Sequence, residues 1–159
     1  MKKVLFLLIA VIALSACKKS QEPATKDTEQ ASENPVFEKE AQYNGSVFVT
    51  FNGKEYETPS IRVKLSKGNE TEATLSMYKV KFVPQMPVTI DLDLPGVNYK
   101  TTGNSYTITG NNIIPTMGGN PFEKYIATDI KGTATKETLS FSLNFGQYPT
   151  RYEGQRITE

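Results

Sequence analysis

The chain has 159 residues, of which 38% are hydrophobic, and its 18 basic and 17 acidic residues give a formal net charge of +1. This length allows one domain with a sizeable core, and the balanced charge gives no basic patch that would indicate nucleic-acid binding. Histidine and tryptophan are absent and there is one cysteine. The sequence therefore excludes Ser-His-Asp and Cys-His nucleophiles, ordinary zinc sites and intrachain disulfides.

Residues 1–16 are typical of a secretory signal peptide. Lys2 and Lys3 precede an apolar run, Val4–Leu14, and small residues follow at Ser15 and Ala16. A transmembrane helix would need about 20 apolar residues, and this run has eleven. We expect residues 1–16 to be removed.

The only cysteine, Cys17, follows this segment directly. The stretch Leu14-Ser15-Ala16-Cys17 resembles the bacterial lipobox, which implies that Cys17 receives a diacylglycerol and, after cleavage, an acylated amine. The alternative is a spare thiol. Several acyl chains would hold the protein firmly on a membrane. We therefore expect a lipid anchor to the outer membrane of a cell envelope, with the periplasmic or surface face left open.

Residues 17–40 differ from what precedes and follows them. The stretch KKSQEPATKDTEQASENPVFEKE mixes charges of both signs and has only Val36 and Phe37 as large apolar residues. Such a composition buries too little surface to offset the entropy of ordering. The sequence predicts a disordered tether, followed by a folded domain over residues 41–159.

The folded part shows the strand period of two in place of a helical period. Apolar residues alternate with polar ones in five clear segments: 47–51, 61–65, 88–94, 106–108 and 139–145. Tyr125–Thr133 also reads as a strand. Asn52-Gly53 and Lys67-Gly68-Asn69 are typical turns, and Pro95-Gly96 is predicted to end the strand before it. In Ala73–Phe82 the apolar positions shift from odd to even, which predicts a bulge near Tyr78-Lys79.

About eight strands joined by short turns predict an all-β, antiparallel up-and-down barrel, because closure removes unpaired edges. A two-sheet sandwich is the alternative architecture. A membrane-spanning barrel would need apolar outer faces, whereas the outward positions predicted here include Arg62, Asp91 and Ser142.

Three segments together resemble a known family. MYKVKFVPQMPVTIDLDLPGV (residues 77–97), YTITGNNIIP (106–115) and IKGTATKETLSFSLNFG (130–146) are similar to the calycin-like β-barrel lipoproteins of Gram-negative bacteria. The resemblance covers most of residues 43–146. It implies a single lipocalin-like barrel after a lipobox and a polar tether, and it implies no catalytic residues.

Candidate binding residues lie in two loops and near the C-terminus. Gly110–Pro121 could form the rim of one barrel mouth, and we single out Asn111, Asn112, Ile114 and Met117. Ordinary turn chemistry is the alternative. Tyr148, Arg151 and Tyr152 could contact a sugar or a protein, although a last strand packed on the barrel explains them as well.

Two further sets have simpler explanations. Asp91 and Asp93 point the same way on one strand and could serve catalysis or a hard metal, but a solvated outer face explains them fully. Apolar residues on several strands could line a cavity or fill the core: Val47, Phe51, Met77, Phe82, Leu92, Phe141 and Phe145.

The sequence thus favours a lipid-anchored envelope domain that binds a small apolar or glycan ligand, or an envelope protein. We expect no enzymatic activity, cofactor or metal. One alternative is a structural or interaction module with a filled core, and a second is a hydrolase that acts through carboxylates.

Overall fold

The computed structural model describes residues 36–83 and 85–157. The predicted signal peptide, Cys17 and most of the predicted tether lie outside the described residues. Within the described residues every regular element is a strand, so they contain no helix long and apolar enough to cross a membrane. The strands are β1 (Glu40–Phe51), β2 (Lys54–Lys67), β3 (Glu72–Val80), β4 (Ile90–Thr102), β5 (Ser105–Gly110), β6 (Thr116–Met117), β7 (Asn120–Pro121), β8 (Ala127–Ala134), β9 (Thr138–Phe145) and β10 (Tyr148–Arg156).

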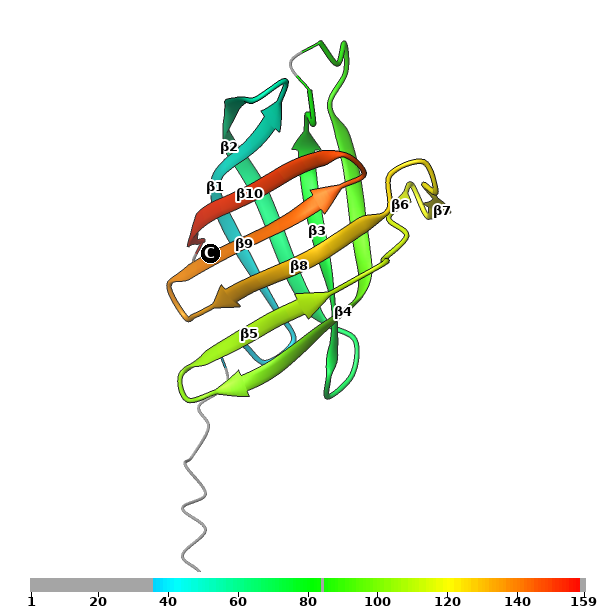
Figure 1. The fold of residues 1–159 in the computed structure, drawn as a ribbon. Coiled ribbons are helices and arrows are strands. Elements are labelled where there is room, and N and C mark those ends of the chain that lie inside the picture. Colours follow the sequence, from blue (N-terminus) through cyan, green and yellow to red (C-terminus); the bar gives the residue numbers. More distant parts are fainter. Residues whose placement is uncertain (1–35, 84, 158–159) are drawn as a thin grey trace, which may run out of the picture. The chain divides into compact units, whose positions relative to one another are not determined.

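Eight of these strands form a closed antiparallel barrel (Figure 1). Each long strand pairs with its neighbour in the chain: β1 with β2, β2 with β3, β3 with β4, β4 with β5, β5 with β8, β8 with β9 and β9 with β10. Pairing of β1 with β10 closes the ring. The short β6–β7 hairpin attaches to β4 beside it. The predicted up-and-down barrel is confirmed, and the sandwich alternative is wrong.

The alternation seen in the sequence places one side of each strand in the core. On β9, Leu139 and Phe141 are buried while Ser140 and Ser142 are exposed. Of the seven apolar residues proposed for the interior, six are buried and Phe51 is half-buried. Each buried Leu or Phe side chain contributes about 1.5–3 kcal/mol, so the shared centre supplies most of the stabilisation.

Tyrosines fill much of the barrel interior. Tyr43, Tyr106 and Tyr152 are among its largest fully buried side chains. Buried hydroxyl groups need partners, and two of these donate to backbone carbonyls: Tyr43 to Thr135 at 3.0 Å and Tyr152 to Ile61 at 3.3 Å. The tyrosine rings therefore occupy the space that a deep central cavity would require.

The predicted bulge in β3 is confirmed. The register with β4 shifts between Met77 and Val80, and Lys79 has a positive φ of 57°. The carboxylate of Asp91 accepts a hydrogen bond from the Lys79 backbone N–H at 2.7 Å. Asp91 thus stabilises the bend that sends the chain toward the β3–β4 connection.

The sequence prediction for β4 is wrong at both ends. Pro95-Gly96 does not end the strand, which continues to Thr102. Gly96 instead adopts a φ of 71° where the register with β3 shifts, so it serves a bulge. Val88 precedes β4 and is 61% exposed, because the connection before Ile90 is not part of the sheet.

One end of the barrel is closed by the chain that enters it. Val36 and Phe37, assigned to the tether from the sequence, are 4% and 5% exposed. The Phe37 ring meets Tyr106 edge-on at 5.3 Å. The Lys67 ammonium lies 5.2–5.8 Å from the Phe37, Tyr99 and Tyr106 ring centres. We call this the closed end, and the folded unit therefore starts before residue 41.

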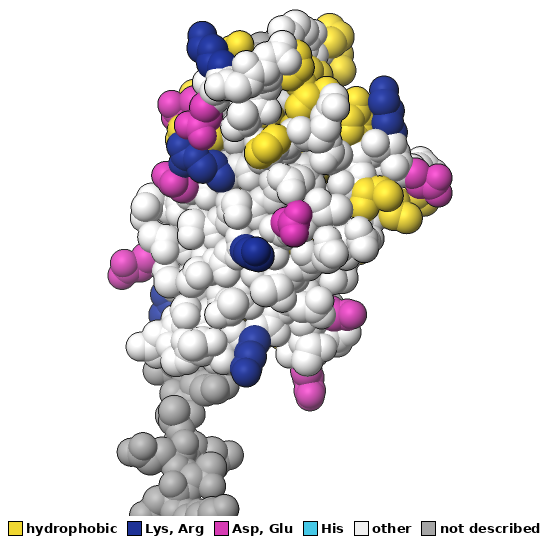
Figure 2. Space-filling model, viewed as in Figure 1, with side chains coloured by type: hydrophobic (Ala, Val, Ile, Leu, Met, Phe, Trp, Pro, Cys, Tyr) yellow, Lys and Arg dark blue, Asp and Glu magenta, His cyan; other side chains and the backbone are white. Residues whose placement is uncertain are grey.

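The opposite end carries the connections β1–β2, β3–β4, β5–β8 and β9–β10. Two of these are long, namely 81–89 and 111–126. Figure 2 shows hydrophobic side chains gathered at this end, over the β3–β4 connection and beside β6 and β7. We call it the open end.

Candidate functional site

The open end holds an apolar pocket of about 290 Å³, which we call the mouth pocket. Its volume is near the lower bound for small-molecule sites. The walls come from both long connections and from the adjoining ends of β4, β6, β9 and β10. The lining residues are Phe82, Val83, Met86, Ile90, Met117, Phe122, Lys124, Tyr125, Phe145 and Tyr148.

A stack of aromatic rings forms one wall of the mouth pocket. Phe145, at the end of β9, stacks on Phe82 with 3.8 Å between the ring centres and on Tyr125 with 5.4 Å between the ring centres. In both pairs the rings are nearly parallel. Phe122 and Tyr148 contact Tyr125 at tilted angles. Rings in this arrangement offer a rigid apolar surface with little rotamer freedom to lose on binding.

Local hydrogen bonds shape the β3–β4 side of the pocket. After the bulge at Lys79 the chain makes a tight turn, in which the Met86 N–H donates to the Val83 carbonyl at 3.1 Å. The Phe82 N–H points at the Met86 sulfur at 3.3 Å. This turn brings Phe82 over the end of β9, where it stacks on Phe145.

The β5–β8 connection builds the other side. Residues Ile113 and Ala127 form an isolated antiparallel bridge, so the segment between them leaves the barrel and returns to it. The Phe122 N–H donates to the Pro115 carbonyl at 2.7 Å. The projecting hairpin, β6 and β7, turns at Gly118 and Gly119, which both have positive φ.

The electrostatics of the mouth pocket are simple. Among the described residues that line it, Lys124 alone is charged. This lysine is exposed, and its ammonium lies 5.2 Å from the centre of the Tyr125 ring. The other ionisable groups among these lining residues are the hydroxyls of Tyr125 and Tyr148.

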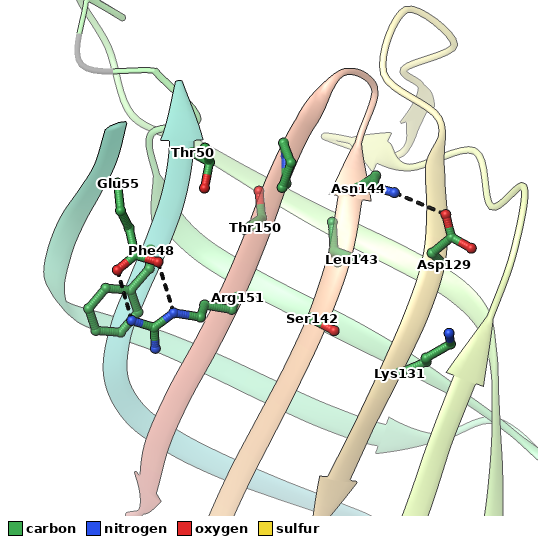
Figure 3. Close-up of a pocket in the computed structure, with 11 residues that line it drawn as sticks. Phe48, Thr50, Glu55, Asp129, Lys131, Ser142, Leu143, Asn144, Thr150 and Arg151 are labelled. Carbon is green, nitrogen blue, oxygen red and sulfur yellow. Dashed lines mark hydrogen bonds and ion pairs between the residues drawn. The ribbon is translucent and has the colours of Figure 1, made fainter. Parts of the chain in front are cut away.

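A second hollow lies on the outer wall of the barrel, across β1, β10, β9 and β8 (Figure 3). It has a volume of about 330 Å³, and its walls combine polar and charged side chains with apolar ones. The lining residues are Phe48, Thr50, Glu55, Asp129, Lys131, Ser142, Leu143, Asn144, Pro149, Thr150 and Arg151. We call it the wall groove. It shares no lining residue with the mouth pocket.

Arg151 is held firmly on one side of the wall groove. Its guanidinium lies 3.5 Å from the Phe48 ring centre. It donates to both carboxylate oxygens of Glu55, at 3.0 and 2.9 Å, and to Glu153 at 2.7 Å. These hydrogen bonds lower the pKa of Glu55 and raise the pKa of Arg151. The planar guanidinium of Arg151 is therefore held over the Phe48 ring by its bonds to the two carboxylates.

Asp129 lies on the other side, in a bulge of β8. The register with β9 shifts between Thr128 and Lys131, and Asp129 has a positive φ of 53°. Its carboxylate accepts a hydrogen bond from the Asn144 amide at 2.9 Å. Its backbone N–H donates to the Asn111 side chain at 3.3 Å. Both contacts hold the bulge in place.

The structure separates the binding residues singled out from the sequence. Met117 and Tyr148 line the mouth pocket, whereas Arg151 lies in the wall groove. Ile114 is 42% exposed beside the mouth without lining it. Two others lie elsewhere: Asn112 occupies an exposed turn with a φ of 54°, and Tyr152 is fully buried.

The structure also shows the surroundings of Asp91 and Asp93, two residues considered from the sequence for catalysis or a metal site. Asp91 stabilises the β3 bulge, as described above, while Asp93 pairs across to Thr116 of β6. Within residues 36–83 and 85–157, no group of three or more His, Cys, Asp or Glu side chains lies close enough to hold a metal ion.

Sequence reasoning missed most of the mouth pocket. Phe82 and Phe145 were expected inside the barrel, but their joint role at its end depends on the long connections. From the sequence alone, no binding role is assigned to Phe122 or Tyr125, and Tyr125 is placed at the start of a strand. These two residues are the aromatic pair of the second long connection. An aromatic pair in a long connection is the signal that could have identified them, because binding residues often lie on loops.

Comparisons of the chain with protein-family models, curated proteins and solved structures find no significant match.

Proposed function

We propose that this protein is a lipid-anchored domain of the cell envelope that binds a small apolar ligand at the open end of its barrel, without catalysis. The mouth pocket carries this proposal. It combines an apolar lining, a rigid aromatic stack and a size suited to a ring or a short acyl chain. Small eight-stranded barrels commonly use one end in this way.

The two ends of the barrel fit this assignment. The described chain enters at the closed end, where Phe37 is buried. An anchor at Cys17 would therefore attach the barrel through the end opposite the mouth pocket. The calycin-like lipoprotein resemblance, which covers most of residues 43–146, implies a lipobox and a polar tether before the barrel.

Binding is tested with the neutral fluorescent probe N-phenyl-1-naphthylamine, whose emission rises in an apolar site. Met117→Glu places a charge in the mouth pocket and should weaken probe binding by at least about tenfold. The matched control is Ile114→Glu, since Ile114 is 42% exposed and Met117 41%, and only Met117 lines the pocket. Urea midpoints establish that both variants are folded.

Three results would count against this function. Equal weakening in both variants would indicate a general apolar rim, as an interaction surface would have. Equal binding in both would place the probe elsewhere. An absence of probe binding would favour the module with a filled core and no small ligand.

The anchor is tested separately. Cells grown with an alkyne-labelled palmitate should yield labelled wild-type protein in the membrane fraction, whereas Cys17→Ser should be unlabelled and leave that fraction. Retention of the label by Cys17→Ser would overturn the anchoring proposal without affecting the mouth pocket.

A further inference from the structure

We propose that the outer wall of the barrel carries a second binding site, which takes a neutral oligosaccharide laid across the strands. The wall groove is one part of this site. The proposal is independent of the mouth pocket, because the two share no lining residue.

The strand register places outward side chains in one row across six strands. Direct cross-strand partners follow each other from β1 to β4: Phe48, Arg151, Ser142, Lys131, Thr109 and Asn98. All six are exposed or half-buried. Neighbouring strands lie about 4.8 Å apart, so the row follows the curved wall over roughly 24 Å, which is five of the eight strand-to-strand steps around the closed ring. A chain of several sugar rings that bends with the wall could follow a large part of it.

The row runs through two adjoining hollows. The wall groove covers its β1–β8 part, and a further hollow of about 370 Å³ covers the part from β8 to β4. Asp129 and Lys131 line both hollows. The β8 bulge therefore lies at their boundary, where its Asp129 carboxylate accepts the hydrogen bond from the Asn144 amide.

The chemistry of this surface matches a neutral, hydroxyl-rich chain. Hydroxyl and amide groups are spread along it, at Ser142, Asn144 and Thr109 for example. Figure 2 shows the middle of this face mostly in white, which marks uncharged polar side chains and backbone, while basic and acidic side chains stand together at its upper left. Such groups can donate to and accept from sugar hydroxyls directly or through water.

The charges on the wall argue against a charged ligand. Arg151 already bonds two carboxylates, those of Glu55 and Glu153. An anionic chain would meet these carboxylates and Asp129, while a cationic chain would meet Arg151 and Lys131. Neither sign has a complementary field. The fixed guanidinium over Phe48 instead provides a flat surface on which a sugar ring can lie.

The test uses the isotope-labelled protein and three neutral hexasaccharides, namely maltohexaose, cellohexaose and chitohexaose, at millimolar concentration. At least one should shift backbone amide NMR signals of β8, β9 and β10 along the row, and added salt should leave the affinity unchanged. Ser142→Leu fills the groove with an apolar side chain and should weaken binding by at least about tenfold. Its matched control, Ser140→Leu, changes an exposed serine on the same strand outside the groove and should bind normally.

The proposal fails if none of the three sugars shifts these signals. It also fails if the two serine variants lose binding equally, because the site would then not be the groove. Tighter binding of an acidic hexasaccharide, hexagalacturonic acid, would refute the argument from charge. These outcomes do not depend on whether the mouth pocket binds the naphthylamine probe, so the two proposals can fail separately.

Discussion

Replacement of Phe37 by alanine should destabilise the whole barrel, although the sequence places this residue in a polar tether. The side chain is only 5% exposed and lies edge-on to Tyr106. Burial of a Phe side chain is worth about 2 kcal/mol, and an aromatic pair adds about 1 kcal/mol. Solvent can enter the space at the barrel end, which limits the cavity penalty. We therefore expect Phe37→Ala to lower the free energy of unfolding by about 3 kcal/mol.

Urea denaturation followed by tyrosine fluorescence measures this change, and the slope of the unfolding free energy against urea should stay constant. Val88→Ala is the control, because Val88 is 61% exposed and should cost less than about 0.5 kcal/mol. A double-mutant cycle with Lys67→Ala should give a coupling of about 0.5–1 kcal/mol through the cation–π contact. A loss below about 1 kcal/mol for Phe37→Ala would refute the role of Phe37 as a part of the folded core at the closed end.

Three more changes test other parts of the barrel. Gly132→Ala should cost about 2–3 kcal/mol in urea denaturation, because its Cβ would lie 2.5 Å from a side-chain carbon and a carbonyl oxygen of β9; a neutral effect would contradict the close packing of β8 on β9. Asp91→Ala should lower the free energy of unfolding by about 1 kcal/mol, because the Lys79 N–H loses its acceptor, while Asp93→Ala should lower it by less. Equal losses would contradict the role of Asp91 in stabilising the β3 bulge. Burial raises the pKa of Tyr152, so its contribution to stability is complete below the unfolded value of about 10 and is lost as the pH rises toward the folded pKa. Tyr152→Phe should therefore flatten the fall in stability above about pH 10, and an unchanged profile would show that another group titrates there.

Alternation of side chains made the barrel predictable. In β9 the inward residues, such as Phe141, and the outward residues, such as Ser142, follow the period of two without interruption. The bulge at Lys79 was predictable for the same reason, since a shift in phase within one strand needs an extra residue. Both inferences use only local geometry, which the sequence carries directly.

Turn composition was less informative than alternation. Pro95-Gly96 is a good turn pair, yet the paired strand β3 accommodates it as a bulge, and β4 continues. Tyr152 was grouped with Arg151 because the two are adjacent. Adjacent residues on a strand point to opposite faces, and so Arg151 is on the wall and Tyr152 is in the core.

The candidate sites depend on barrel closure, which no single segment encodes. Phe82 and Phe145 are far apart in the sequence, and their rings stack only because β3, β4 and the intervening connection return to the end of β9. The row across the outer wall likewise joins strands whose register is fixed by pairing rather than by composition.

The position of Phe145 limits what the mouth pocket can accept. This residue is 1% exposed and lies between Phe82 and Tyr125, while Tyr152 and Phe141 stack beyond it inside the barrel at 5.2 Å. A ligand that entered more deeply would have to displace a buried aromatic ring, at a cost of several kcal/mol. Entry from the other side is blocked by Phe37 and Lys67. Affinity should therefore rise with ligand length only until the mouth pocket is filled, and longer chains should extend into solvent without further gain.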